Sequence, residues 1–215
     1  MDAQTLKLRI SPTVNAVTAK YTAPNHPICT LTLAHGAGAG MDHPFMEALA
    51  GSLADAGIAV LRFNFPFSEQ QKRRPDSPAV AHQTIAAAIA KARTLNPMLP
   101  LIAAGKSFGG RMTSQYLAAH PDSGVAGIVF YGFPLHPAGK PATVRADHLQ
   151  QLRIPMLFLQ GSRDALATWE LIHSVCNSLP LASLVRLEGA DHSFKAGKHS
   201  VLPTLVSETV KWVPR

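Results

Sequence analysis

The residues best suited to chemistry form a short segment in the middle of the chain, where Ser107 stands between Gly105 and Gly109. An apolar run at 101–104 predicts a buried strand, and helix-forming sequence follows from Arg111. A G-x-S-x-G pattern between a strand and a helix is typical of a sharp turn that exposes a nucleophilic serine. The flanking positions press against neighbouring backbone, so residues without a Cβ fit there. We therefore interpret Ser107 as a candidate nucleophile.

The same letters allow two other interpretations. Gly105, Lys106 and Ser107 match the end of a phosphate-binding loop, G-x-x-x-x-G-K-[ST]. That loop requires a glycine five residues before Gly105, where this chain has Pro100, and residues 101–104 are apolar instead of a flexible cradle. A match by chance is the remaining alternative, because short motifs often occur without function. Residues elsewhere in the chain decide between these interpretations.

Two further residues supply what a serine nucleophile needs. A serine hydroxyl reacts when a base takes its proton, and that base needs a third group to orient it. Asp164 follows one expected strand and His192 follows the last, so the chain order Ser, Asp, His favours Ser107, Asp164 and His192 as a catalytic triad. The alternative interpretation is that Asp164 only caps a turn. Asp191 is a second acid candidate, but a residue adjacent to His192 is poorly placed to fold back onto the imidazole.

The glycine-rich segment 35–40 follows another buried strand and suits the stabilisation of an oxyanion. Preorganised backbone N–H groups stabilise such a charge by about 3–4 kcal/mol each, and we assign the two donors to the amides of Ala37 and Phe108. A dinucleotide site is the weaker interpretation, because G-x-G-x-G is not G-x-G-x-x-G. Arg62 and Asn64 also stand where an acidic residue would end the next strand of such a site.

Composition sets further bounds on the protein. The chain has 215 residues, 47% of them apolar and 15% charged, which predicts a single domain over residues 1–215 with a sizeable core. Cys29 and Cys176 lie in apolar segments and are expected to be buried, reduced thiols, as is typical of a cytoplasmic protein. The first ten residues contain no apolar signal-peptide core, and no stretch approaches the length of a membrane span.

The net charge of +7 admits nucleic acid, an anionic membrane or an anionic substrate as partners. Most positive charges are scattered along the chain. The one cluster, Lys72, Arg73 and Arg74, lacks interleaved aromatic residues, so we expect a solvated loop there. We therefore expect no nucleic-acid partner and no membrane partner, while an anionic small substrate stays open.

Strands and helices that must position these residues alternate along the chain. Apolar or β-branched runs predict strands at 6–10, 14–22, 28–34, 58–63, 101–104, 125–131, 156–159 and 183–187. Helical spacing predicts helices at about 42–56, 79–95, 111–120, 145–152, 169–179 and 202–212, the first of them capped by Asp42. The alternation from residue 28 onward predicts a mainly parallel sheet with helices on both faces, and the two N-terminal strands extend one edge antiparallel. The carboxyl ends of parallel strands meet at one edge, where Ser107, Asp164 and His192 would converge.

Together these motifs resemble those of the α/β-hydrolases, in particular the small dienelactone-hydrolase-like members. Within those the chain is similar to the group that contains the testis-expressed hydrolase-like proteins of animals and their bacterial relatives. The segments that carry the resemblance are 35–40, 62–65, 105–111, 131–136, 139–141, 161–164 and 191–192. The resemblance implies an eight-stranded sheet, a triad of Ser107, Asp164 and His192, and an esterase-type site. We expect no metal and no cofactor.

Two features set the chain apart from better-known hydrolases. The segment between residues 131 and 156 is too short for a large cap domain, so we expect no large lid domain. Dienelactone hydrolases proper use a cysteine nucleophile, whereas this chain has Ser107. The loop at 132–140 would then roof the site, and Phe133 and His136 are candidate residues to contact substrate.

Two other candidate substrate-binding residues are His35 and Lys106. His35 is also expected to form a structural hydrogen bond beneath the site. Basic side chains near the site are expected to form salt bridges or to be solvated, with attraction of an acidic substrate as the alternative. These side chains are Lys106, Arg111, Lys140 and Arg145.

The sequence therefore predicts a serine hydrolase of carboxylesterase type that acts on a small soluble ester or acyl compound. Ser107 would form an acyl-enzyme, with His192 as the base and Asp164 as its orienting group. A non-catalytic binding or scaffold protein on the same fold is the alternative, because a fold alone does not guarantee chemistry. A nucleotide-binding protein is disfavoured by Pro100. A second copy of the chain, giving a homodimer, is a candidate partner.

Overall fold

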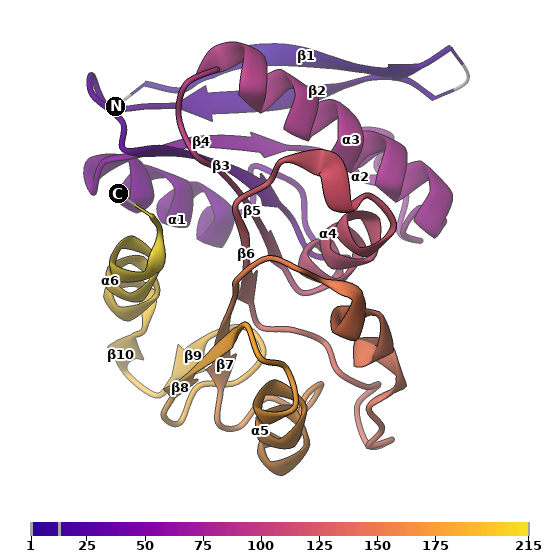
Figure 1. Ribbon diagram of the computed structural model, residues 1–215, viewed down its shortest axis with the longest axis vertical. Helices are drawn as coiled ribbons and strands as arrows, with labels where there is room; N and C mark the ends of the chain where they lie inside the picture. The colour runs from indigo at the N-terminus through magenta and orange to yellow at the C-terminus, as the bar shows by residue number, and fades with distance from the viewer. Residues whose placement is uncertain (1, 13, 215) are drawn as a thin grey trace.

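An eight-stranded sheet runs through the computed structural model, which describes residues 2–12 and 14–214 (Figure 1). The spatial order is β1-β2-β4-β3-β5-β6-β7-β8. The strands are β1 (Gln4–Ser11), β2 (Asn15–Thr22), β3 (Cys29–Ala34), β4 (Ile58–Phe63), β5 (Leu101–Lys106), β6 (Gly127–Tyr131), β7 (Met156–Gly161) and β8 (Ala182–Leu187). The pairs β1·β2 and β2·β4 are antiparallel and the pairs from β4 to β8 are parallel. A short hairpin, β9 (Lys195–Ala196) with β10 (His199–Ser200), lies apart from the sheet.

The central strands are apolar because helices cover both faces of the sheet. Every residue of β3, β4, β6 and β7 is buried, which explains their near-continuous apolar sequences. The edge strand β1 instead alternates between exposed and more buried positions along part of its length. Arg62 is the charged exception within β4, and its guanidinium pairs with Glu47 at 3.0 Å.

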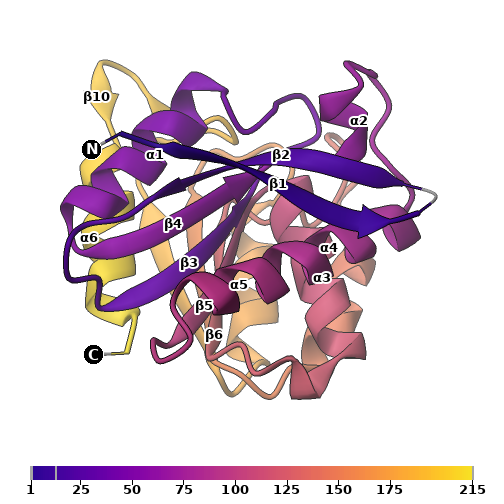
Figure 2. The ribbon, with the colours of Figure 1, turned by 90° about the horizontal axis from the view of Figure 1, so that it is seen from above.

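Helices lie in two groups, one on each face. The α-helices are α1 (Pro44–Asp55), α2 (Pro66–Glu69), α3 (Pro78–Leu95), α4 (Phe108–Ala119), α5 (Trp169–Asn177) and α6 (Leu202–Trp212). Two 3-10 helices, η1 (Pro121–Ser123) and η2 (Val144–Gln151), lie in the connections. Helices α1 and α6 cover one face, and α3, α4 and α5 cover the other (Figure 2). Each group closes a separate hydrophobic core against the sheet.

These features confirm the predicted architecture, a mostly parallel eight-stranded sheet with helices on both faces. The connection from β6 to β7 carries only loops and η2, with no lid domain among its residues. One local prediction was wrong, because His43 and not Asp42 caps α1. The His43 Nδ1 accepts a hydrogen bond from the Phe45 amide at 3.2 Å, while Asp42 pairs with Lys20 at 2.8 Å. Pro44 occupies the first helical position, which makes the residue before it the cap.

The carboxyl ends of the parallel strands carry the candidate site residues. His35 follows β3, Ser107 follows β5, Asp164 lies three residues beyond β7, and His192 lies in the loop after β8. Parallel strands present these ends at one edge of the sheet, so the four positions converge. Over the described ranges, no helix has the length and apolar character needed to cross a bilayer.

Candidate active site

The turn between β5 and α4 holds Ser107 in a strained conformation. Its φ of 51° is positive, which is uncommon for a residue with a Cβ and is a feature of over-determined functional turns. Both flanking glycines are required by close backbone contacts. A Cβ on Gly105 would lie 2.3 Å from the Gly110 amide nitrogen, and one on Gly109 would lie 2.6 Å from the Ala34 carbonyl oxygen. The spacing Gly-x-Ser-x-Gly is therefore a consequence of how closely α4 approaches β5 and β3.

Ser107, His192 and Asp164 form one continuous hydrogen-bonded chain. The Ser107 Oγ lies 2.8 Å from the His192 Nε2, and the His192 Nδ1 lies 2.7 Å from the Asp164 Oδ2. An ionised carboxylate can only accept a hydrogen bond, so the contact with Asp164 places the His192 proton on Nδ1. The Nε2 lone pair then faces the Ser107 hydroxyl. The three side chains thus have the relative placement that a nucleophile, a base and an orienting acid require.

Two further contacts fix the Asp164 carboxylate. Its Oδ2 accepts a hydrogen bond from the Gln160 side-chain amide at 2.6 Å, and its Oδ1 accepts one from the Leu166 amide at 2.7 Å. The Asp164 side chain has no exposed surface, so these donors replace the water that the charge has lost. Gln160 was not singled out from the sequence. Its only signal is that it interrupts the apolar strand β7.

A close approach between two loops brings His192 to Asp164. A Cβ on Gly161 would lie 2.3 Å from the Ala190 carbonyl oxygen, and the Arg163 amide donates to that same oxygen at 2.9 Å. Asp191, the other acid considered from the sequence, does not bond to His192. Its carboxylate accepts hydrogen bonds from the Ser193 and Lys195 amides at 2.8 and 2.9 Å and so shapes the loop that carries His192.

Ala37 and Phe108, whose amides are the predicted oxyanion donors, both line the larger cavity that borders Ser107. Ala37 lines both cavities that border Ser107. Phe108 is the first residue of α4, a position whose N–H has no partner within the helix. The N-terminus of α4 therefore directs donors and a partial positive charge toward the Ser107 hydroxyl.

His35 lies beneath the site and not at its surface. The residue is fully buried, its Nε2 accepts a hydrogen bond from the Phe65 amide at 3.0 Å, and its Nδ1 lies 2.8 Å from the Gly36 carbonyl oxygen. Burial lowers the pKa of His35 to about 4, so the ring is neutral at physiological pH. This is the structural hydrogen bonding that we expected. His35 lines neither of the cavities beside Ser107.

Phe133 and His136 turn inward from the loop after β6. Phe133 is buried against Phe130 and Phe158, with ring centroids 5.2 and 5.9 Å away. The His136 Nε2 accepts a hydrogen bond from the Thr168 amide at 2.9 Å. Neither side chain lines a cavity beside Ser107, so they brace the roof of the site and do not form its surface. Pro134 and Leu166, which were not predicted, line it in their place.

Lys106 is held against the loop that carries His192. Its Nζ donates a hydrogen bond to the His192 carbonyl oxygen at 2.6 Å and lies 4.8 Å from the centre of the Phe194 ring. Burial lowers the pKa of Lys106 to about 8, although the nearby charges of Asp164 and Asp191 oppose this effect. The ammonium group therefore ties the strand end beside Ser107 to the loop that carries His192.

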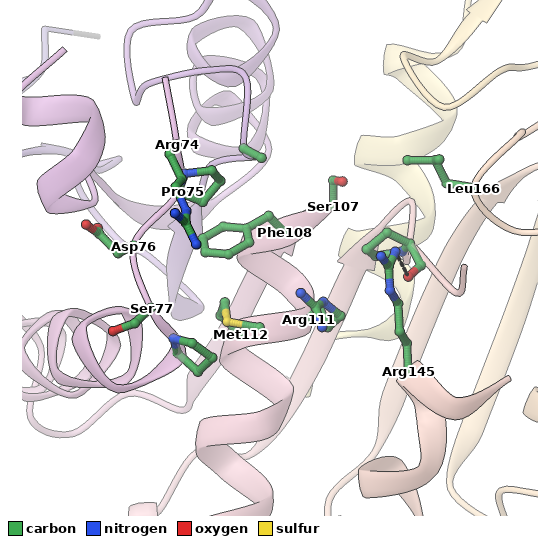
Figure 3. Close-up of a pocket in the computed structure, with 13 residues that line it drawn as sticks. Arg74, Pro75, Asp76, Ser77, Ser107, Phe108, Arg111, Met112, Arg145 and Leu166 are labelled. Carbon is green, nitrogen blue, oxygen red and sulfur yellow. Dashed lines mark hydrogen bonds between the residues drawn. The ribbon is translucent and has the colours of Figure 1, made fainter. Parts of the chain in front are cut away.

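Two cavities meet at Ser107. The larger has a volume of about 670 Å³ and is lined by α4, by the loop before α3 and by η2 (Figure 3). The smaller has a volume of about 260 Å³ and is lined by the glycine-rich loop after β3 and by Phe45, Met46 and His192. A substrate bound at Ser107 therefore has one space on each side of the reacting atom.

Comparison with known proteins identifies the family. Residues 27–207 match the model of the alpha/beta hydrolase domain family, and the chain belongs to that family. The fold is similar to that of XC6422 from Xanthomonas campestris, described as an α/β serine hydrolase without lid. It is 21% identical to the chain, with a TM-score of 0.79, over 100% of this chain and 97% of the other.

Two other solved structures are similar in fold. Dienelactone hydrolase from Anabaena variabilis is 18% identical, with a TM-score of 0.77, over 98% of this chain and 96% of the other. Est1E from Butyrivibrio proteoclasticus is 16% identical, with a TM-score of 0.74, over 99% and 97%. At these identities the structures establish a shared fold. The predicted membership of the α/β-hydrolases is confirmed, whereas the narrower likeness to testis-expressed proteins stays a prediction.

Proposed function

We propose that this protein is a serine hydrolase of carboxylesterase type that acts on a small ester or related acyl compound. The observation that carries the proposal is the hydrogen-bonded chain from Ser107 through His192 to Asp164, with distances of 2.8 and 2.7 Å. The family to which the chain belongs, and relatives described as a serine hydrolase and a dienelactone hydrolase, favour the same conclusion.

Acylation begins when the Ser107 Oγ attacks the ester carbonyl and the His192 Nε2 takes the hydroxyl proton. The resulting oxyanion accepts hydrogen bonds from the amides of Ala37 and Phe108. Asp164 stabilises the imidazolium and holds its Nδ1–H in place. His192 then gives the proton to the departing alkoxide, which leaves as an alcohol and completes the acyl-enzyme.

Deacylation repeats these steps with water as the nucleophile. His192 takes a proton from the water, whose oxygen attacks the acyl carbonyl. The tetrahedral intermediate collapses, the proton returns to the Ser107 Oγ, and the carboxylic acid departs. The strained, partly exposed position of Ser107 and the two cavities that border it suit a small substrate that enters from solvent.

The test replaces the nucleophile and a matched control serine. Ser107→Ala is expected to abolish covalent labelling by a fluorophosphonate probe and to lower kcat for para-nitrophenyl acetate by about four orders of magnitude. Ser207→Ala, which removes an exposed hydroxyl on α6, should change neither readout. Labelling that persists in Ser107→Ala would contradict the proposal. A folded wild-type protein that neither labels nor hydrolyses esters would favour a binding or scaffold role.

A further inference from the structure

The larger cavity beside Ser107 contains three arginines from three separate segments. Arg74 comes from the loop before α3, Arg111 from α4 and Arg145 from η2. Figure 3 shows Arg111 and Arg145 as neighbouring side chains of this cavity, with Ser107 between Phe108 and Leu166. We call this space the arginine-lined cavity.

The guanidinium groups of the arginine-lined cavity lack acidic partners. Within residues 2–12 and 14–214 none of the three forms an ion pair. Arg145 donates a long hydrogen bond of 3.4 Å to the Pro134 carbonyl oxygen. The Arg111 guanidinium is half-buried and forms no hydrogen bond within the described residues. Its donors are therefore available to solvent or to a ligand, and of the two expected states, a salt bridge or a solvated side chain, the described residues show no salt bridge.

The charges around Arg111 repel each other. Burial and the neighbouring charge of Arg145 lower the pKa of Arg111. Burial and the charge of Arg111 also lower the pKa of His148 to about 4, so His148 is neutral and is hydrogen-bonded to Ser114 at 2.7 Å. An anion between the two arginines would relieve this repulsion.

The carboxylates near the cavity do not neutralise it. Asp76 lines the wall, but its carboxylate accepts a hydrogen bond from the Phe67 amide at 3.0 Å. In Figure 3 the Asp76 carboxylate points away from Arg111. Asp147, near His148, is exposed to solvent. The arginine-lined cavity therefore keeps a net positive charge next to the nucleophile.

We propose that the arginine-lined cavity binds an oxyanion of the substrate, so that this enzyme acts on esters that carry a second, acidic group such as a carboxylate or a phosphate. This inference rests on the proposed hydrolase function and defines its substrate class. Planar guanidinium groups bind carboxylate and phosphate through paired hydrogen bonds, so both anions share the required chemistry.

The position of Arg111 sets the spacing within the substrate. Arg111 lies in the first turn of α4, and its backbone amide donates a hydrogen bond to the Ser107 carbonyl oxygen at 3.1 Å, so the two residues are close neighbours. The anionic group therefore lies only a few carbon atoms from the scissile ester. The smaller cavity, with Phe45 and Met46 in its wall, takes the uncharged part of the molecule.

The test compares matched pairs of anionic and neutral esters. Para-acetoxybenzoate against its methyl ester places the charge on the alcohol side. The mono-para-nitrophenyl ester of adipic acid against para-nitrophenyl hexanoate places it on the acyl side. Para-acetoxyphenyl phosphate against phenyl acetate tests phosphate. We expect kcat/KM of at least one anionic ester to exceed that of its neutral partner by about tenfold or more, the effect of a charge-assisted hydrogen bond.

Two variants assign that preference to the cavity. Arg111→Met should lower the ratio of anionic to neutral kcat/KM by about ten- to one hundred-fold. Arg153→Met removes an exposed arginine that lines neither cavity, and it should leave the ratio unchanged. Arg145→Met is the second cavity variant and serves if Arg111→Met does not fold. Equal rates within all three pairs, or an unchanged ratio in the cavity variant, would overturn the inference while the hydrolase function stands.

A binding measurement separates this inference from the proposed function. If wild type hydrolyses no ester and takes no fluorophosphonate label, the proposed function has failed. Calorimetric titration with para-hydroxybenzoate and with inorganic phosphate then decides the inference by itself. Binding of either anion that weakens about tenfold or more in Arg111→Met supports an oxyanion site and shows which anion it prefers. Absence of binding, or equal binding by wild type and Arg111→Met, overturns it.

Discussion

Replacement of Lys106 by methionine is expected to change the pH dependence of stability. Lys106 is the charged group closest in sequence to the nucleophile, and its Nζ donates to the His192 carbonyl oxygen at 2.6 Å. Methionine keeps most of the length of the side chain but removes the charge and the hydrogen bond. Loss of that bond should loosen the loop that carries His192, so we expect kcat for para-nitrophenyl acetate to fall by about tenfold.

The magnitude follows from the depressed pKa of Lys106, about 8 in the folded protein against an ordinary value of 10.5. Between these two values the unfolded chain keeps a proton that the folded chain has released, so stability rises with pH in this window. Below pH 8 both states are protonated and the folded state bears the full penalty of a buried charge. At about 1.4 kcal/mol for each pKa unit, that penalty is about 3 kcal/mol, of which about 2 kcal/mol disappears between pH 7.5 and 9.5.

Urea denaturation of wild type and Lys106→Met at pH 7.5 and 9.5 measures this effect. Other groups titrate in both proteins, so their contributions cancel in the difference. The free energy of unfolding of wild type should rise relative to Lys106→Met by about 2 kcal/mol over this range. Lys140→Met, which removes an exposed lysine, is the control and should show no such change. An equal difference between wild type and Lys106→Met at both pH values would refute the reasoning.

Two further predictions concern the turn and the residue beneath the site. Gly105→Ala should destabilise the fold by about 2 kcal/mol or more, because its Cβ would lie 2.3 Å from the Gly110 amide nitrogen. Gly51→Ala, in α1 with no atom within 4 Å of the added Cβ, should instead stabilise the fold by about 1 kcal/mol. Urea denaturation measures both variants, and a Gly105→Ala variant as stable as Gly51→Ala would contradict the prediction. His35 has a folded pKa of about 4 against 6.5, so the unfolded chain protonates first and stability falls as pH drops through this range. His35→Ala should therefore have a lower free energy of unfolding than wild type at pH 7, and this difference should shrink by about 2 kcal/mol at pH 5. A difference that is equal at both pH values would count against a buried, neutral His35.

The sequence by itself determined the fold class and the turn around Ser107. Both depend on local rules. Apolar runs alternate with helical spacing, which leaves few arrangements other than a covered parallel sheet. Gly105 is fixed by a backbone contact within the strand–turn–helix unit, so the local pattern indicates the turn, whereas Gly109 is fixed by its contact with the end of β3. Even so, the cap of α1 moved from Asp42 to His43, because Pro44 sets where the helix begins.

Tertiary structure alone decided which side chains meet. The sequence already favoured Asp164 over Asp191 as the partner of His192, but the contact itself depends on how the loops after β7 and β8 approach each other, through Gly161 and Ala190. Gln160 donates a hydrogen bond to Asp164, and its only sign in the sequence is that a polar residue interrupts an apolar strand.

Side-chain direction was likewise outside the reach of the sequence. Phe133 and His136 belong to the roof segment that was expected to contact substrate, yet both turn into the core. Arg111 and Arg145 lie 34 positions apart in the chain and share one cavity beside Ser107. Sequence spacing predicts which helix or strand holds a residue and at which end of a strand it lies. The neighbours of its side chain depend on how elements far apart in the chain pack together. The sequence therefore located the candidate nucleophile, and only the packing of α4 against η2 brought Arg111 and Arg145 together in the cavity beside it.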